Sequence, residues 1–220
     1  MACNHQAKIA SALLEIGAVG FQIESPVRFA SGILSPVYCD NRLLISYPDH
    51  RNTVLGAMLN LLQEQNIHPE VVAGTATAGI PHAAWLADRL RLPMVYVRSS
   101  AKGHGQNRMV EGVFTPQAQV LLVEDLVTTG GSSLAAILAL RDLGARVDHI
   151  LSIFTYDFPV ARSNFQEQGV QPSYLLSLDE LLHQALHESK ITRKEENEVR
   201  AWQADPQAWS DLREKSSEKV

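Results

Sequence analysis

The stretch VLLVEDLVTTGGSS, residues 120–133, is the part of the chain that predicts both the fold and the place of a functional site. Its four leading apolar residues predict a strand that is buried on both faces, as in a parallel sheet covered by helices. Two adjacent acids, Glu124 and Asp125, follow at the carboxyl end of that strand. Open α/β sheets bind their ligands at this end of the strands, so we expect the site here.

The residues after the two acids have the composition of a phosphate-binding turn. Gly130 and Gly131 allow backbone N–H groups to approach an anion, and Thr128, Thr129 and Ser132 add hydroxyl donors. A helix is predicted to start here, and its amino end contributes positive potential. The same residues also suit an ordinary βα turn whose hydroxyls cap the helix. The two preceding acids favour a sugar phosphate, with the acids on ring hydroxyls or on a hydroxyl-bound magnesium ion.

Short apolar runs and amphipathic stretches alternate on both sides of this segment. The predicted strands cover residues 71–73, 94–97, 120–123 and 147–154, and the predicted helices cover residues 7–18, 46–62, 80–90 and 134–143. Two S/T-x-x-E capping boxes, at residues 177–180 and 192–195, predict further helices in the C-terminal part. This alternation predicts an α/β fold with a central, mostly parallel sheet flanked by helices.

The composition argues against several classes of protein. A length of 220 residues fits one sizeable domain. Nineteen Lys and Arg residues against 24 Asp and Glu residues give a net charge of −5, which disfavours binding to nucleic acid or an anionic membrane by bulk charge. No run approaches the ~18 apolar residues that a membrane span needs. Cys3 and Cys39 form no C-x-x-C pair, so neither a disulfide framework nor a zinc site is indicated, and a reducing cytoplasm fits best.

Two further polar segments could belong to the same site. The turn GTATAG, residues 74–79, would bring backbone amides close to a diphosphate, and it also suits a plain βα connection. The stretch RSSAKGHGQNRMVEG, residues 98–112, has no apolar periodicity and carries Arg98, Lys102 and His104. These cations predict either a lid that closes on a polyanion or a solvated surface loop.

Common nucleotide and metal motifs do not fit. The P-loop pattern fails because Gly79 is followed by Ile80, and G-x-G-x-x-G fails because Arg108 stands where the last glycine is needed. His183 and His187 are four residues apart on a predicted helix, but no third ligand accompanies them. We therefore interpret both histidines as surface or packing residues.

The segment at residues 120–133 resembles the signature of type I phosphoribosyltransferases, which bind the ribose 5-phosphate of phosphoribosyl pyrophosphate (PRPP) in such a turn. Three more segments are similar to those of the orotate-using members: residues 28–42 to the substrate-side segment, 73–87 to the pyrophosphate loop and its helix, and 97–112 to the mobile catalytic loop. The resemblance implies one domain over residues 1–220, with a small N-terminal hood at about 1–45. The polar composition at the C-terminal end separately predicts a disordered tail at about 210–220.

The resemblance also implies an activity and its partners. It implies a magnesium-dependent transferase that joins orotate to PRPP, giving orotidine 5′-phosphate and pyrophosphate in pyrimidine biosynthesis. It further implies a homodimer with shared active sites, in which Lys102 and His104 reach the neighbouring subunit. Mg²⁺ is the implied cofactor, and no residue of the chain is predicted as a dedicated metal ligand.

The site residues are carried over from the family position by position. The implied PRPP-binding residues are Arg98, Lys102, His104, Glu124, Asp125, Leu126, Val127, Thr128, Thr129, Gly130, Gly131 and Ser132. Among them Asp125, Lys102 and His104 are the implied catalytic residues, and Thr128 is the implied orotate contact.

The sequence departs from its relatives on the side of the base. Ser99 stands where many relatives have a second basic residue, and Ala30 and Leu34 stand where some have lysines. How the orotate carboxylate is held is therefore open. Two alternatives follow: a transferase for another base such as a purine, or a PRPP-sensing regulator without catalysis. Lys102 and His104 disfavour the regulator, because a sensor has little use for residues directed at a leaving group.

Overall fold

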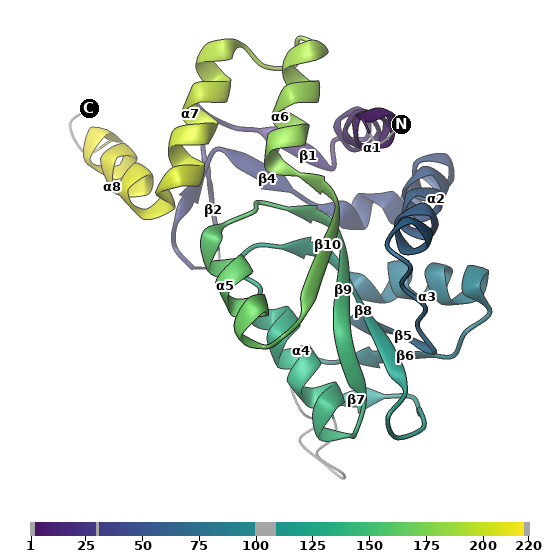
Figure 1. Ribbon diagram of the computed structural model, residues 1–220. Coiled ribbons are helices and arrows are strands. Elements are labelled where there is room, and N and C mark those ends of the chain that lie inside the picture. The colour runs from purple at the N-terminus through teal and green to yellow at the C-terminus, as the bar shows by residue number, and fades with distance from the viewer. Residues whose placement is uncertain (1–2, 30, 100–108, 218–220) are drawn as a thin grey trace. The chain divides into compact units, whose positions relative to one another are not determined.

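The computed structural model describes residues 3–29, 31–99 and 109–217 (Figure 1). The chain forms two compact units, of which one consists of Met1–Ser46 and Leu178–Val220 and the other of Tyr47–Ser177. The single domain predicted over residues 1–220 stays a prediction. Both the acidic pair and the glycine-rich turns lie in the unit Tyr47–Ser177.

The unit Tyr47–Ser177 is built on a six-stranded sheet with the strand order β10-β9-β8-β5-β6-β7. The strands are β5 (Val71–Thr75), β6 (Met94–Val97), β7 (Val110–Glu111), β8 (Gln119–Val127), β9 (Arg146–Thr155) and β10 (Gln171–Ser177). All neighbouring pairs are parallel except β6 and β7, which pair antiparallel at the edge. The prediction of a mostly parallel α/β sheet is confirmed.

Four helices cover the two faces of this sheet. They are α2 (Pro48–Glu64), α3 (Gly79–Leu90), α4 (Gly131–Asp142) and α5 (Pro159–Glu167). Figure 1 shows α4 and α5 on one side of the sheet and α2 and α3 on the other. Apolar residues at helical spacing on α2, such as Val54 and Met58, are buried, as the sequence pattern predicted.

The central strand β8 sends alternate side chains to the two faces. Val120 and Leu122 belong to the core cluster that includes Ile137 and Leu140 of α4. Side chains along a strand alternate with a period of two, so Glu124 continues the row that faces α4. The strand thereby places one of its two acids beneath the start of that helix.

Some sequence-based expectations for this unit differ from the structure. The strand predicted to end at residue 123 continues to Val127, because β8 keeps its pairing with β9 as far as Thr155. Both acids therefore lie within the strand. Helix α5 and strand β10 were not predicted, since no element was expected between residue 154 and the capping box at residue 177.

The other unit combines short antiparallel pairs with helices. Its elements are α1 (Cys3–Glu15), β1 (Val19–Phe21), β2 (Val27–Arg28), β3 (Leu34–Ser35), β4 (Val37–Cys39), η1 (Asn41–Ser46), α6 (Leu178–His187), α7 (Arg193–Ala204) and α8 (Pro206–Ser217). Strand β1 pairs with β4 and β2 with β3, both antiparallel. The capping box predicted at Thr192 is confirmed, because its hydroxyl and Glu195 bond reciprocally at the start of α7. Helix α8 covers most of the stretch predicted as a disordered tail, so that expectation is wrong for residues 210–217.

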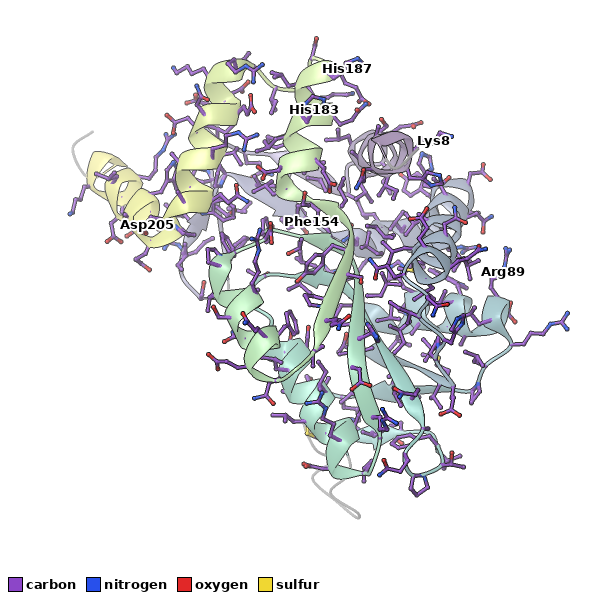
Figure 2. The ribbon with its side chains drawn as sticks, viewed as in Figure 1. Lys8, Arg89, Phe154, His183, His187 and Asp205 are labelled. Carbon is purple, nitrogen blue, oxygen red and sulfur yellow. The ribbon has the colours of Figure 1, made fainter. Side chains whose placement is uncertain are left out.

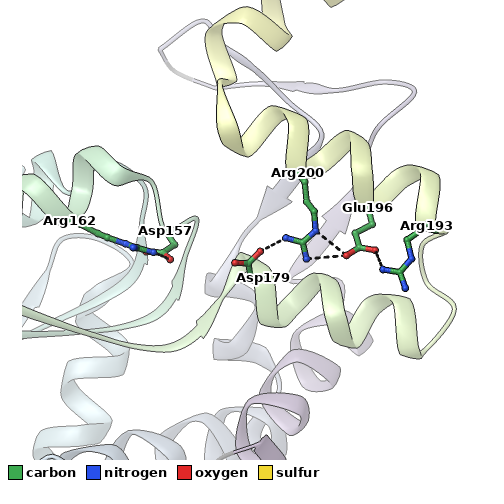
Figure 3. A network of polar contacts seen from close by, with 6 residues as sticks. All are labelled: Asp157, Arg162, Asp179, Arg193, Glu196 and Arg200. Atoms are coloured by element: carbon green, nitrogen blue, oxygen red, sulfur yellow. Dashed lines mark hydrogen bonds and ion pairs between the residues drawn. The ribbon is translucent and has the colours of Figure 1, made fainter.

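A buried carboxylate and two arginines of α7 form a cluster that Arg200 links to α6. Glu196 is 4% exposed and accepts hydrogen bonds from Arg193 at 2.6 Å and Arg200 at 3.0 Å (Figure 3). Arg200 also donates to Asp179 of α6 at 2.5 Å. The two arginines hold the pKa of Glu196 below its ordinary value despite its burial. We interpret the cluster as structural, because a buried carboxylate needs such partners.

Leu34, one of the departures from the relatives, has a structural role in this unit. Its carbonyl accepts a hydrogen bond from Trp202 Nε1 at 2.9 Å, and its amide donates to Ser210 Oγ at 3.0 Å. These bonds attach β3 to helices α7 and α8. Ala30 lies outside the described residues. Among the helices that the structure describes, none combines the length and apolar character needed to cross a membrane.

Candidate active site

A cavity of about 310 Å³ opens where β5, β6 and β8 end in the unit Tyr47–Ser177. The cavity is lined by residues at the ends of β5 and β6 and by residues of β8 and α4 with their neighbours. They are Thr75, Ala76, Thr77, Ala78, Val97, Arg98, Ser99, Met109, Glu124, Asp125, Leu126, Thr128, Ser132, Ala135 and Ala136. Three segments that are distant in sequence thus meet at the carboxyl edge of the sheet. This is the place that the topology of a parallel sheet favours for a ligand.

Glu124 is the buried member of the acidic pair. Its side chain is 5% exposed, and Oε1 accepts a hydrogen bond from Ser133 Oγ at 2.9 Å. Burial raises the pKa of Glu124 to about 7, and the charge of Asp125 adds to this effect. Hydrogen bonds from Thr75 and Ser133 act in the opposite direction. Asp125 is less buried and lines the same cavity.

The turn after β8 is shaped by Gly130. This residue has a φ of +80° and caps the amino end of α4, and a Cβ there would lie 3.0 Å from the ring of Phe165. Glycine alone meets both conditions without strain. Asn164 Nδ2 donates to the carbonyl of Thr129 at 3.0 Å, which anchors the turn to α5. The first turn of α4 therefore presents its amino end at the cavity, as an anion site requires.

The turn after β5 brings α3 unusually close to the acids. A Cβ at Gly79 would lie 2.6 Å from the carbonyl oxygen of Val123 and 2.7 Å from Thr75 Oγ1. Glycine at this position is therefore required by packing. The Ala76–Thr77 peptide bond is cis, and the amide of Ala76 donates to the Val97 carbonyl at 2.7 Å. The turn lines the same cavity as the start of α4.

Among the described residues that line the cavity, Arg98 is the one with a cationic side chain. Its guanidinium forms an ion pair with Glu111 at 3.4 Å, and its backbone amide donates to the carbonyl of Met109 at 2.8 Å. The side chain of Arg98 is about one third exposed. Lys102 and His104, which were predicted to act with Arg98, lie outside the described residues.

Some of the predicted residues of β8 and the following turn line the cavity and others do not. Glu124, Asp125, Leu126, Thr128 and Ser132 line the cavity. Val127 is 1% exposed and belongs to the core, and the exposed Thr129 does not line the cavity. Sequence reasoning missed the hydrogen bond between Ser133 and Glu124, and also Ala135 and Ala136. The helical spacing from Ser132 would have indicated those two alanines.

The histidine pair on α6 lies at the surface of its unit. His183 and His187 are both exposed and are labelled on α6 in Figure 2. Among the described residues, no group of three or more His, Cys, Asp or Glu side chains is close enough to hold a metal ion.

Comparisons with known proteins match the chain over nearly its whole length. The phosphoribosyl transferase domain family matches residues 50–160. The orotate phosphoribosyltransferase of Coxiella burnetii (strain RSA 493 / Nine Mile phase I) is 47% identical over 206 residues, which are 94% of this chain and 99% of the relative. That of Bacillus cereus (strain ATCC 10987 / NRS 248) is 44% identical over 204 residues, 92% of this chain and 97% of the relative.

A solved structure supports the same assignment. The crystal structure of orotate phosphoribosyltransferase from Aeropyrum pernix has a TM-score of 0.71 and 32% sequence identity, and the match covers 80% of this chain and 96% of that one. The sheet order, the cavity at its carboxyl edge and these relatives agree. The chain therefore belongs to the phosphoribosyltransferase family, and within it to the orotate phosphoribosyltransferases.

Proposed function

We propose that the chain transfers the 5-phosphoribosyl group of PRPP to N1 of orotate, giving orotidine 5′-phosphate and pyrophosphate. One observation carries this proposal: a single cavity is lined by the acids of β8, the first turn of α4 and the turn after β5. PRPP presents a 5-phosphate, ring hydroxyls and a diphosphate. Each of these groups has a suitable counterpart among the three segments.

The residues around the ribose stabilise the charge that the reaction develops. The bond from C1 to the pyrophosphate oxygen breaks, a bond from C1 to orotate N1 forms, and the proton of N1 is lost. Positive charge develops on the ribosyl ring as the leaving group departs, and the carboxylates of Glu124 and Asp125 favour it. The amino end of α4 and the hydroxyls of Thr128 and Ser132 hold the 5-phosphate.

Arg98 binds the diphosphate in this proposal. In the ligand-free protein its guanidinium is paired with Glu111 at a distance of 3.4 Å. A partly exposed pair of this length is weak, so a diphosphate with more charge competes well for the guanidinium. Lys102 and His104 are expected to add positive charge and a proton donor at the leaving group.

Magnesium is part of the proposal as a companion of the substrate. Mg²⁺ in phosphate-transferring sites uses one or two carboxylates together with substrate phosphates, and Glu124 and Asp125 fit that requirement. When bound, the ion would neutralise charge on the diphosphate and make it a better leaving group. The absence of a three-residue metal cluster among the described residues is compatible with this role.

An initial-rate assay with different bases tests the proposal. The protein is incubated with Mg²⁺, PRPP and orotate, uracil or hypoxanthine in turn, and base consumption is followed by absorbance. We expect orotate to be consumed, with uracil and hypoxanthine poorer by at least about a hundredfold in kcat/KM. A preference for hypoxanthine would favour the purine alternative, and PRPP binding without turnover would favour a regulator.

We further propose a homodimer with shared sites, acting in the cytoplasm. Lys102→Ala and Asp125→Asn proteins should each be nearly inactive, whereas mixing them after subunit exchange should restore activity, since half of the mixed sites carry neither change. No recovery after verified exchange would contradict shared sites. In the described part of the chain Cys39 belongs to no disulfide, which is compatible with a reducing compartment.

A further inference from the structure

A buried serine in the first turn of α4 contacts Glu124, the buried member of the acidic pair. Ser133 is the third residue of α4 and is 1% exposed. Its Oγ donates a hydrogen bond to Glu124 Oε1 at 2.9 Å. Glu124 is also buried, with 5% of its surface exposed. This hydrogen bond joins the helix that begins at the phosphate turn to the strand that carries the acids.

The neighbouring hydroxyls do not hold Glu124 against α4. Ser132 precedes Ser133, but it is exposed and lines the cavity instead. Thr75 approaches Glu124 from β5, yet its single proton is shared with the carbonyl oxygen of Val123, which lies 3.3 Å from Thr75 Oγ1. Ser133 is therefore the hydroxyl that fixes Glu124 relative to α4.

We propose that Ser133 is a positioning residue, which holds the Glu124 carboxylate at a set distance from the amino end of α4. The inference rests on the proposed function, in which α4 binds the 5-phosphate and the Glu124 carboxylate accepts hydrogen bonds from the ribose hydroxyls. A sugar phosphate touches both elements at once, so their separation decides how well both contacts form. Ser133 thereby contributes to selecting a ribosyl phosphate over a phosphate without ring hydroxyls.

The expected effect is specific to the sugar. A buried hydrogen bond to a charged group strongly favours one orientation, and Glu124 loses that restraint in Ser133→Ala. Ribose 5-phosphate should then bind roughly ten- to a hundredfold more weakly. Ethyl phosphate, which offers a phosphate without ring hydroxyls, should bind as before because α4 and its turn are unchanged.

Binding measurements separate this role from general stability. Dissociation constants for ribose 5-phosphate and ethyl phosphate are measured by calorimetry on the wild type, Ser133→Ala and Ser133→Cys, since Cys has the shape of Ser with a larger sulfur atom and donates only weakly. The matched control is Ser173→Ala, which removes a buried hydroxyl that donates to Gln65 at 2.5 Å in the same unit. Steady-state kinetics should also show a higher KM for PRPP and a nearly unchanged KM for orotate.

The outcomes distinguish the inference from the proposed function. The wild type should bind ribose 5-phosphate more tightly than ethyl phosphate. We expect this preference to decrease in both Ser133 variants and to stay at the wild-type value in Ser173→Ala. A folded Ser133→Ala or Ser133→Cys protein with the wild-type ratio would overturn the positioning role alone. A wild type that binds ribose 5-phosphate no better than ethyl phosphate would overturn the proposed function and this inference together.

Discussion

The burial of Glu124 should make the stability of the ligand-free protein depend on pH. Burial raises the pKa of Glu124 from 4.5 to about 7 in the folded state, and the adjacent Asp125 adds to this. Between these values the native protein keeps a proton that the unfolded chain releases, so the free energy of unfolding falls as pH rises. At about 1.36 kcal/mol for each unit of pKa, the loss between pH 4.5 and 7 is about 3 kcal/mol.

Replacement of this carboxyl by an amide should remove the dependence. Between pH 5 and 8 the free energy of unfolding of Glu124→Gln should fall by about 3 kcal/mol less than that of the wild type. At pH 8 the variant should be the more stable protein. Arg98, the cation of the same cavity, is present in both proteins. Urea unfolding at pH 5, 6, 7 and 8, without phosphate or magnesium, measures this difference.

A surface change provides the control for this experiment. Glu167→Gln removes an exposed carboxyl on α5 of the same unit and should leave the pH profile like that of the wild type. If the free energy of unfolding changed equally with pH in Glu124→Gln and the wild type, the reasoning would be refuted. The buried carboxyl would then titrate alike in the folded and unfolded states.

Three further changes test separate parts of the site. Thr128→Val should raise the KM for orotate much more than that for PRPP, and equal increases would argue against a base contact. Arg98→Ala should raise the KM for PRPP about tenfold or more in steady-state assays, whereas an unchanged KM would remove Arg98 from the diphosphate site. Gly79→Ala should lower the free energy of unfolding by about 1–3 kcal/mol, since its Cβ would lie 2.6 Å from the Val123 carbonyl oxygen. Unchanged urea unfolding of that variant would show that α3 can move away.

Local patterns predicted the elements that build the site. The apolar run before Glu124 and Asp125 predicted the central strand, and the residues around Gly130 predicted the turn ahead of α4. Both features depend on a few neighbouring residues, so a single sequence displays them. The end of β8 was predicted too early, because the strand continues by pairing with β9, a contact that lies outside the local pattern.

Contacts between distant segments were not predictable in this way. The bond from Ser133 to Glu124 depends on how α4 packs over β8, and the ion pair of Arg98 with Glu111 depends on the pairing of β6 with β7. Strand β10 was missed because its sequence, QPSYLLS, has no β-branched residue and becomes a strand by pairing with β9.

The most direct test of the account asks whether this cavity carries out phosphoribosyl transfer. Orotate absorbance is followed with Mg²⁺, with and without PRPP, in the wild type and in Asp125→Asn, and pyrophosphate is measured in parallel. We predict that the wild type consumes orotate only with PRPP, with one pyrophosphate per orotate, and that Asp125→Asn folds normally but loses about two orders of magnitude in kcat/KM. No orotate consumption by the wild type, or equal rates in the two proteins, would contradict the account.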